Sequence, residues 1–159
     1  MQIKRKIKRY VVAVILLILS AYTTIFIKNY VDSKNPEKSL PIINVSVGYV
    51  QPAVQRAGYT WKFGTGIAPT LSPYVSAEDV PLMVMDCYPG DIVINFSTQP
   101  ELVTVYQTEG LANNNFRQLY TLTTPQEEGV YVYKVDAQFE KGDILYYFAV
   151  HVKNDNIMQ

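Results

Sequence analysis

The residues that could carry out nucleophilic chemistry are few, because the sequence contains one histidine and one cysteine. A catalytic cysteine needs a neighbouring base to form its thiolate, so Cys87 and His151 are the pair to consider. His151 lies in an alternating apolar run, on the side opposite its apolar residues, and no G-x-S-x-G motif accompanies it. We interpret His151 as an exposed or edge residue and Cys87 as a buried thiol beside Met83 and Met85. A lone cysteine excludes an internal disulfide and leaves an intermolecular one open.

Metal and phosphate patterns are equally sparse. One His and one Cys cannot supply the usual zinc ligands. The paired carboxylates Glu78-Asp79 and Glu127-Glu128 lack the spacing of a calcium loop, and Gly64-Thr65-Gly66 lacks the further Gly and Lys of a phosphate loop. A glycosidase needs two carboxylates across a cleft, and the sequence selects no pair. We therefore expect no metal, no cofactor and no catalytic residue, and predict that the protein is not an enzyme.

Two loops remain as candidate contact surfaces. Residues 64–80 form a long connection with apolar residues among small polar ones, and residues 107–117 combine an Asn-rich turn with an aromatic and a cation. Long connections in compact domains are often functional, and aromatic or Arg side chains are frequent anchors of a partner. The candidate partner contacts in these loops are Ile67, Leu71, Tyr74, Phe116 and Arg117.

The elements that must hold these loops begin with a hydrophobic segment. Residues 10–27 are eighteen residues without a charge, or about 27 Å of helix, which matches the hydrocarbon thickness of a bilayer. Residues 1–9 form a basic tail with five Lys or Arg, and cationic flanks are retained on the cytoplasmic side. The sequence therefore predicts a signal anchor at the cell membrane, with a cytoplasmic N-terminus and everything after Lys28 outside. A cleaved signal peptide is the alternative, and it also places the domain outside.

Beyond the predicted anchor, residues 28–40 are polar and contain Pro36, as is typical of a stalk. Residues 41–153 form the predicted domain, followed by a short tail at 154–159. From residue 41 the chain carries six basic residues against twelve acidic ones, a formal net charge of −6. An acidic domain without a basic stripe disfavours nucleic acid as a partner.

The sequence of the domain predicts β-strands. Thirteen Tyr and six Phe, with many Val and Ile, favour β-structure, and Gly, Pro, Asn and Asp separate the apolar runs. Glu140-Lys141-Gly142-Asp143 predicts a hairpin turn between the last two strands. We expect a two-sheet antiparallel sandwich, with a closed barrel as the alternative. The strand-like runs are 43–49, 59–63, 80–85, 91–96, 101–107, 117–122, 131–139 and 144–152.

One segment resembles a known fold family. Glu128-Gly129-Val130-Tyr131, preceded by Glu127, is similar to the acidic-x-Gly-x-Tyr pattern of immunoglobulin-like domains, in which the Tyr forms a corner at the start of a late strand. The resemblance implies that Trp61 is a core residue of an early strand. The position two after Tyr131 is Tyr133 where that family has Cys, so the inter-sheet disulfide is absent. Residues 58–66 and 129–150 also resemble uncharacterised extracytoplasmic domains of Gram-positive bacteria, a resemblance that implies fold and location but no reaction.

Taken together, these features predict a membrane-tethered immunoglobulin-like domain that binds a protein or a cell-envelope component. A carbohydrate or cell-wall binding module is the first alternative, since exposed aromatic side chains can stack on sugars. An extracytoplasmic hydrolase that uses His151, Cys87 or a carboxylate pair is the second.

Overall fold

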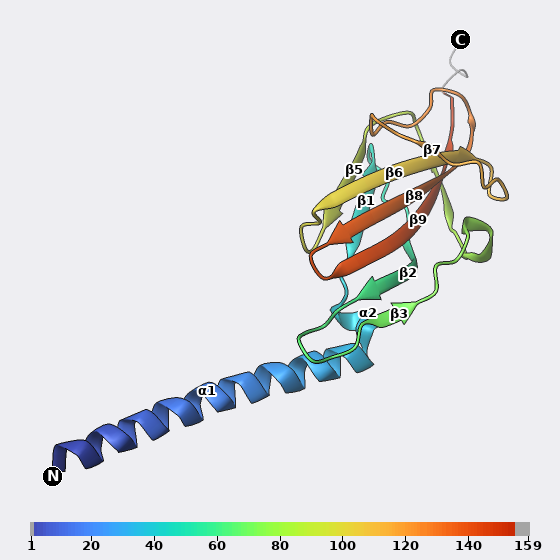
Figure 1. Ribbon diagram of the computed structural model, residues 1–159. Helices are drawn as coiled ribbons and strands as arrows, with labels where there is room; N and C mark the ends of the chain where they lie inside the picture. The colour runs from blue at the N-terminus through green and yellow to red at the C-terminus, as the bar shows by residue number, and fades with distance from the viewer. Residues whose placement is uncertain (1, 155–159) are drawn as a thin grey trace. The chain divides into compact units, whose positions relative to one another are not determined.

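The computed structural model describes residues 2–154, with side chains described from residue 9 onward. The chain divides into two compact units. The helical unit contains the residues up to Leu40 together with Lys62–Ala68, and the β unit contains Pro41–Trp61 and the chain from Pro69 onward. Their helices and strands are labelled in Figure 1.

The helical unit is built on one long helix, α1 (Gln2–Lys34), followed by the short α2 (Pro36–Ser39). The stretch Arg9–Lys34 is long and apolar enough to cross a membrane, with a mean hydropathy of 2.4. The predicted span at 10–27 lies inside α1, and most of the predicted stalk is helical as well, in the end of α1 and in α2. Pro36 explains where α1 ends, because a residue before proline disfavours the helical conformation.

The β unit contains two sheets. The small sheet pairs β1 with β5, and the large one has the order β3-β2-β9-β8-β6-β7, with β4 also on β9. β9 is the central strand: β8 pairs along one edge, while β2 and then β4 share the other. Every pairing is antiparallel except that of β4 with β9. The strands are β1 (Ile43–Val47), β2 (Gln55–Trp61), β3 (Thr70–Ser72), β4 (Val84–Cys87), β5 (Ile92–Phe96), β6 (Leu102–Glu109), β7 (Arg117–Gln118), β8 (Gly129–Phe139) and β9 (Gly142–Val152).

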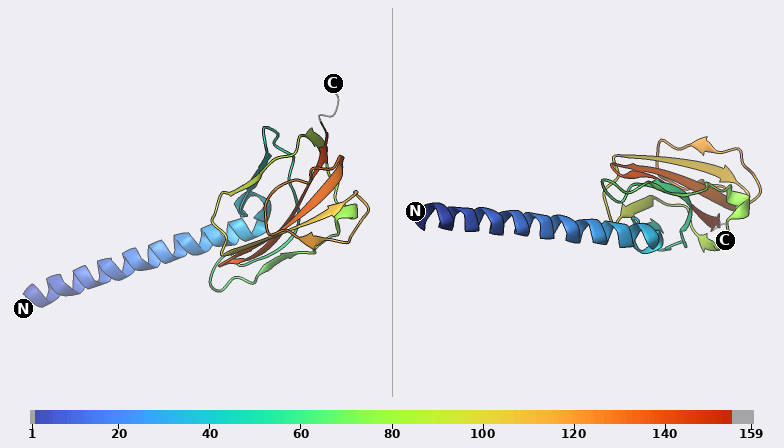
Figure 2. Two further views of the ribbon diagram at one scale, coloured as in Figure 1. Left: turned by 90° about the horizontal axis from the view of Figure 1, so that it is seen from above. Right: turned by 60° about the horizontal axis from the view of Figure 1, so that its bottom comes forward.

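The main core lies between the two sheets, whose separate layers are visible in Figure 2. Phe96 of β5 packs edge-to-face on Phe139 and Tyr146, with ring centroids 6.0 and 6.5 Å apart. We call this side of β8 and β9 the inner face; Tyr133 and Phe148 stack within it at 4.7 Å. Within the strand-like run 131–139, Lys134, Asp136 and Gln138 are at least partly exposed between buried neighbours, as in a strand with one buried face.

The opposite, outer face of the large sheet is partly buried too. Leu145, Tyr147 and Ala149 of β9 form a second cluster with Val132, Ala57 and Ala77. The 3-10 helix η1 (Ala77–Asp79) and the following residues Val80 and Leu82 cover this cluster. The sequence predicted one apolar face for β9; the structure buries both, since this strand lies in the middle of the large sheet.

The broad prediction is confirmed: the body is mostly β, with two sheets and an N-terminal apolar helix. The predicted hairpin is confirmed as well, because Phe139 pairs directly with Gly142. Among the described residues the strands form two sheets and not the closed barrel that was the alternative.

Several strand boundaries were wrong. The run predicted at 43–49 ends at Val47, because Gly48, at φ +56°, turns the chain there and leaves Tyr49 fully exposed. The strand predicted at 80–85 is found at 84–87, and only the first two residues of 117–122 are strand. The loop predicted at 64–80 contains β3 and η1. Phe63 is buried, but in the helical unit and outside any strand.

Candidate functional site

The five predicted contact residues are divided between the two units. Ile67 belongs to the helical unit, whereas the other four belong to the β unit. Leu71 on β3 and Tyr74 just after it are 68% and 52% exposed. Phe116 instead packs on Tyr147 at 5.9 Å and against the outer-face cluster, so it is partly a core residue. Arg117 and Tyr74 each line a cavity, and these two cavities are the candidate sites.

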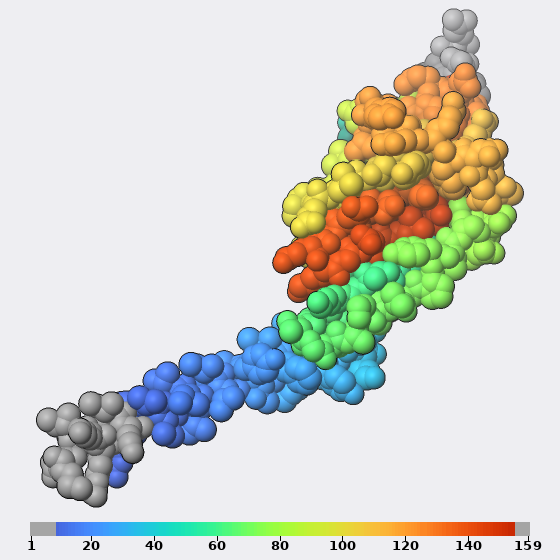
Figure 3. Space-filling view, viewed as in Figure 1, coloured from blue at the N-terminus to red at the C-terminus, as the bar shows by residue number. Residues whose placement is uncertain are grey.

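The larger cavity, which we call the β6–β7 pocket, has a volume of about 600 Å³. This volume falls in the range of small-molecule and peptide-anchor sites. Loop residues 110–128, drawn in orange beside the yellow β6 in Figure 3, contribute much of its wall. Its lining residues come from three stretches of the chain and are Gln107, Thr108, Glu109, Asn113, Asn115, Arg117, Gln118, Leu119, Pro125, Glu127 and Tyr131.

Backbone and side-chain hydrogen bonds fix the walls of the β6–β7 pocket. Gly110 takes a left-handed conformation, at φ +82°, and its N–H donates to the Val130 carbonyl, so the loop leaves β6 sharply. The side-chain oxygen of Asn113 accepts the N–H of Asn115 at 3.0 Å, which shapes the loop tip. On the opposite wall, the hydroxyl of Tyr131 donates to the Glu127 carbonyl at 3.2 Å.

The pocket offers both charges and many hydrogen-bonding groups. Arg117 provides the cation, and Glu109 and Glu127 provide two carboxylates. Burial, and then the nearby charges of Glu109 and Glu127, raise the pKa of Tyr131. Thr108 is only 4% exposed, and its side-chain oxygen has no hydrogen-bond partner in the described part of the chain. A buried hydroxyl without a partner at a pocket wall favours binding of a ligand or a water molecule that can form the missing hydrogen bond.

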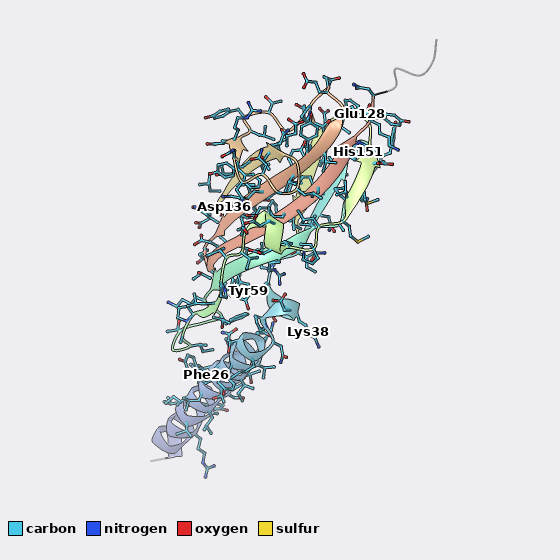
Figure 4. The ribbon with its side chains drawn as sticks, turned by 90° about the vertical axis from the view of Figure 1, so that its right-hand side faces the viewer. Phe26, Lys38, Tyr59, Glu128, Asp136 and His151 are labelled. Atoms are coloured by element: carbon cyan, nitrogen blue, oxygen red, sulfur yellow. The ribbon has the colours of Figure 1, made fainter. Side chains whose placement is uncertain are left out.

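The second cavity, the Tyr74 cleft, has a volume of about 320 Å³ on the outer face of β8 and β9. Its lining residues are Tyr74, Lys134, Asp136, Gln138, Asp143 and Leu145. Lys134, Asp136 and Gln138 share a face because alternate residues of a strand point the same way. Figure 3 shows the red stripe of β8 and β9 open between β6 and the segment around β3, and Asp136 is labelled in Figure 4.

Gly58 determines where Tyr74 lies. β2 has a register shift between Arg56 and Gly58, and Gly58 has φ +147°. A Cβ at Gly58 would lie 2.7 Å from the Tyr74 Cα and 2.8 Å from the Pro73 carbonyl oxygen. Only glycine lets the chain approach β2 this closely. The Tyr74 hydroxyl is 3.4 Å from the Thr60 hydroxyl, which orients the ring beside the polar row.

The charges of the Tyr74 cleft are coupled. Partial burial raises the pKa of Asp136; the Lys134 ammonium opposes this, and Asp143 adds to it. Lys134 is also held over the rings of Tyr106 at 4.7 Å and Phe116 at 5.9 Å. Asp136 and Asp143 both line the cleft, whereas the sequence selected no carboxylate pair.

The structure also contains a third polar group, made of Asp86, His151 and Lys153, that the sequence did not predict. Parallel pairing of β4 with β9 places Asp86 opposite His151, whose ring nitrogen lies 2.9 Å from the carboxylate, and Lys153 pairs with the same carboxylate. These hydrogen bonds, first from Lys153 and then from His151, lower the pKa of Asp86. Figure 4 shows His151 at the same end of the β unit as Glu128, away from Asp136. The partners are far apart in sequence, and no local pattern links them.

Cys87 does not join His151. It follows Asp86 in β4, so its side chain points to the other face, where it is buried. Burial, and then the Asp86 charge, raise the pKa of the thiol, which disfavours the nucleophilic thiolate. The prediction of a buried thiol is confirmed, but Met83 and Met85 are both exposed and are not its core neighbours.

Of the two carboxylate pairs considered for calcium, Glu78-Asp79 makes hydrogen bonds to nearby loop residues. Asp79 accepts the hydroxyl of Ser76 at 2.7 Å, and Glu78 accepts the Asn114 side-chain amide at 3.3 Å. These contacts tie η1 to the tip of the Asn-rich loop. Among the residues whose side chains the structure describes, no three His, Cys, Asp or Glu are grouped as metal ligands.

Comparison of the chain with protein-family models, with curated proteins and with solved structures finds no match.

Proposed function

We propose that this protein is a membrane-tethered binding protein without enzymatic activity. α1 crosses the cell membrane once, the N-terminus is cytoplasmic, and the β unit binds a protein or a cell-envelope polymer on the outer side. The single observation that carries the proposal is the β6–β7 pocket: about 600 Å³, walled by the Asn-rich loop, with Arg117 and two carboxylates in its lining. The apolar stretch Arg9–Lys34 supports the tether, and the basic residues at its start support the orientation.

The proposed β unit is an immunoglobulin-like sandwich. In that family a Tyr at the start of a late strand bonds back to the backbone a few residues upstream, and the bond from Tyr131 to Glu127 fits this pattern. Trp61 is buried edge-on against Phe139 at 5.4 Å, as expected for a core Trp. In place of the disulfide cysteine, Tyr133 stacks on Phe148. Such sandwiches present loops at their ends for recognition, which suits a binding role.

The ligand of the β6–β7 pocket is a polar segment with hydrogen-bonding groups of both kinds. The side-chain amides of the lining can donate and accept, as peptide groups require. Arg117 can bind a carboxylate in two-point geometry, whereas Glu109 and Glu127 attract an amino group. A peptide segment of a protein partner meets all three requirements.

Charge reversal at Arg117 tests this function in intact cells that produce the tagged full chain. A membrane-impermeant cross-linker should capture a partner with the wild type, and Arg117→Glu should reduce its recovery about tenfold or more, because a paired charge at an interface is costly to lose. Lys141→Glu makes the same charge change in the β8–β9 turn, outside the pocket lining, and should leave recovery unchanged.

Equal recovery of the partner with Arg117→Glu and with the wild type would show that the β6–β7 pocket is not the binding site. A partner captured only by a membrane-permeant cross-linker would instead place the β unit on the inner side and overturn the orientation while leaving the pocket in place.

A second candidate function is carbohydrate binding at the Tyr74 cleft. The observation that favours it is an exposed aromatic ring in the same cleft as five further residues, four of them with hydrogen-bonding side chains. Aromatic faces stack on sugar rings, and neighbouring amides and carboxylates bond sugar hydroxyls.

Tyr74 variants test that function by binding to glycan arrays and to isolated cell-wall polymer. Tyr74→Ala should weaken binding about threefold to tenfold through loss of stacking, whereas Tyr74→Phe should retain most of it. Tyr120→Ala is the matched control, since Tyr120 is 90% exposed but lines neither cavity. Binding that survives in Tyr74→Ala would exclude this cleft as a sugar site.

A further inference from the structure

The loop that joins β2 to β3 packs on α1. Residues Lys62–Ala68 belong to the helical unit and not to the β unit whose strands they connect. A Cβ at Gly64 would collide with the side-chain amide of Asn29, and a Cβ at Gly66 would contact the Phe26 ring at 3.9 Å. Phe26 is labelled on α1 in Figure 4. The loop therefore lies against one short stretch of the helix, and Gly64 leaves room there for the Asn29 side chain.

That stretch is the end of the apolar run. Ile27 is the last residue of the uncharged segment, and Lys28 is the first charge after it. Because an α-helix rises about 1.5 Å per residue, Phe26 and Asn29 bracket this boundary within about 5 Å along the axis. In a helix that spans a bilayer, acyl chains give way to lipid headgroups at this level.

The chemistry of the loop suits the headgroup layer. Lys62–Ala68 contains a cation and the partly exposed Ile67 but no acidic residue. The adjacent part of α1 adds Lys28, and Lys34 with its ammonium 5.4 Å from the ring centroid of Tyr30. Lys and Tyr are typical of membrane–water interfaces, where the ring or the aliphatic stem is buried and the polar end is hydrated.

We infer that Lys62–Ala68 is a second membrane contact, a loop that lies in the lipid headgroup layer beside α1. Ile67 adds apolar contact near the acyl boundary, and Lys62 pairs with lipid phosphate. The inference rests on the membrane span in the proposed function. It gives the loop a role separate from the Tyr74 cleft, although the sequence groups both in one long connection.

The test uses the full chain in vesicles of phosphatidylcholine and phosphatidylglycerol, with the environment-sensitive dye NBD on a new cysteine. Ile67→Cys and, as a second site, the exposed Thr65→Cys should show a blue-shifted emission and lose most of their fluorescence to nitroxide near the lipid headgroups. Tyr120→Cys in the β unit serves as the water-exposed reference. The native Cys87 is buried, and the chain without an added cysteine measures its background labelling.

A label at Ile18→Cys, in the middle of the apolar run, separates the two proposals. Strong quenching at residue 18 by nitroxide deep in the acyl chains, with no quenching at residues 65 and 67, overturns the loop contact and leaves the span. Absence of quenching at residue 18 overturns the span and the loop contact with it. Quenching at residues 18, 65 and 67 supports both.

Discussion

Replacement of Gly142 by alanine is expected to destabilise the β unit by on the order of 3 kcal/mol or more. Gly142 opens β9 with φ +143°, a conformation that L side chains rarely adopt. A Cβ there would collide with the carbonyl oxygen of Thr60 and lie 3.2 Å from the Trp61 Cα. Both atoms belong to the backbone of β2, so no flexible side chain can move aside. Relief requires separating β2 from β9, the pairing that extends the large sheet to β3.

Trp61 reports this change directly. It is the only tryptophan of the chain, it is buried, and it pairs with Gly142 across the β2–β9 ladder. Urea unfolding of the full chain in detergent, followed by Trp61 fluorescence, should show a lower midpoint for Gly142→Ala with an unchanged slope.

Gly110→Ala is the matched control for Gly142→Ala. Gly110 also has positive φ, +82°, but no atom lies within 4 Å of an added Cβ, so only backbone strain of about 1 kcal/mol is expected. Equal losses in Gly142→Ala and Gly110→Ala would show that the collision with Thr60 is relieved at no cost.

Local patterns predicted the elements that depend on neighbouring residues. The long apolar run predicted α1, and the turn at Glu140-Lys141 predicted the β8–β9 hairpin, because in both the contacts that form the element lie close in sequence. Tyr74 and Arg117 were selected for the same kind of reason: an aromatic and a cation in polar loops.

Local sequence patterns could not predict the pairing of strands that are far apart in the sequence. β4 pairs with β9 in parallel, and Val84 and Met85 remain exposed, so its sequence carries no buried-strand alternation. The Asp86–His151 contact depends wholly on this pairing. The β6–β7 pocket likewise needs Thr108 and Glu127 from separate segments. The burial of β9 on both faces does have a local signal, because Ile144–Val150 is an unbroken apolar run of the kind found in strands buried on both faces.

Substitution of Tyr133 is expected to have the other large effect on stability. Two variants distinguish the contribution of its ring from that of its hydroxyl. The ring is fully buried and stacks on Phe148 at 4.7 Å with an interplanar angle of 7°. Tyr133→Ala leaves a cavity in the inner core and should cost about 3 to 5 kcal/mol. The hydroxyl is buried with no hydrogen-bond partner in the described chain, and burial strongly raises its pKa. Tyr133→Phe removes an unsatisfied polar group and should therefore be neutral or stabilising by about 1 kcal/mol.

Tyr146 provides the matched comparison on the neighbouring strand. Its hydroxyl donates to the Pro41 carbonyl at 2.9 Å, and burial raises its pKa to about 12 against the opposing effect of Arg56. Tyr146→Phe loses a satisfied hydrogen bond and should cost about 1 kcal/mol, opposite in sign to Tyr133→Phe. The urea unfolding midpoints of Tyr133→Ala, Tyr133→Phe and Tyr146→Phe, each compared with the wild type, measure these changes in stability. If Tyr133→Phe is destabilised as much as Tyr146→Phe, the Tyr133 hydroxyl has a partner in the folded protein, and a buried water between the sheets is the first candidate.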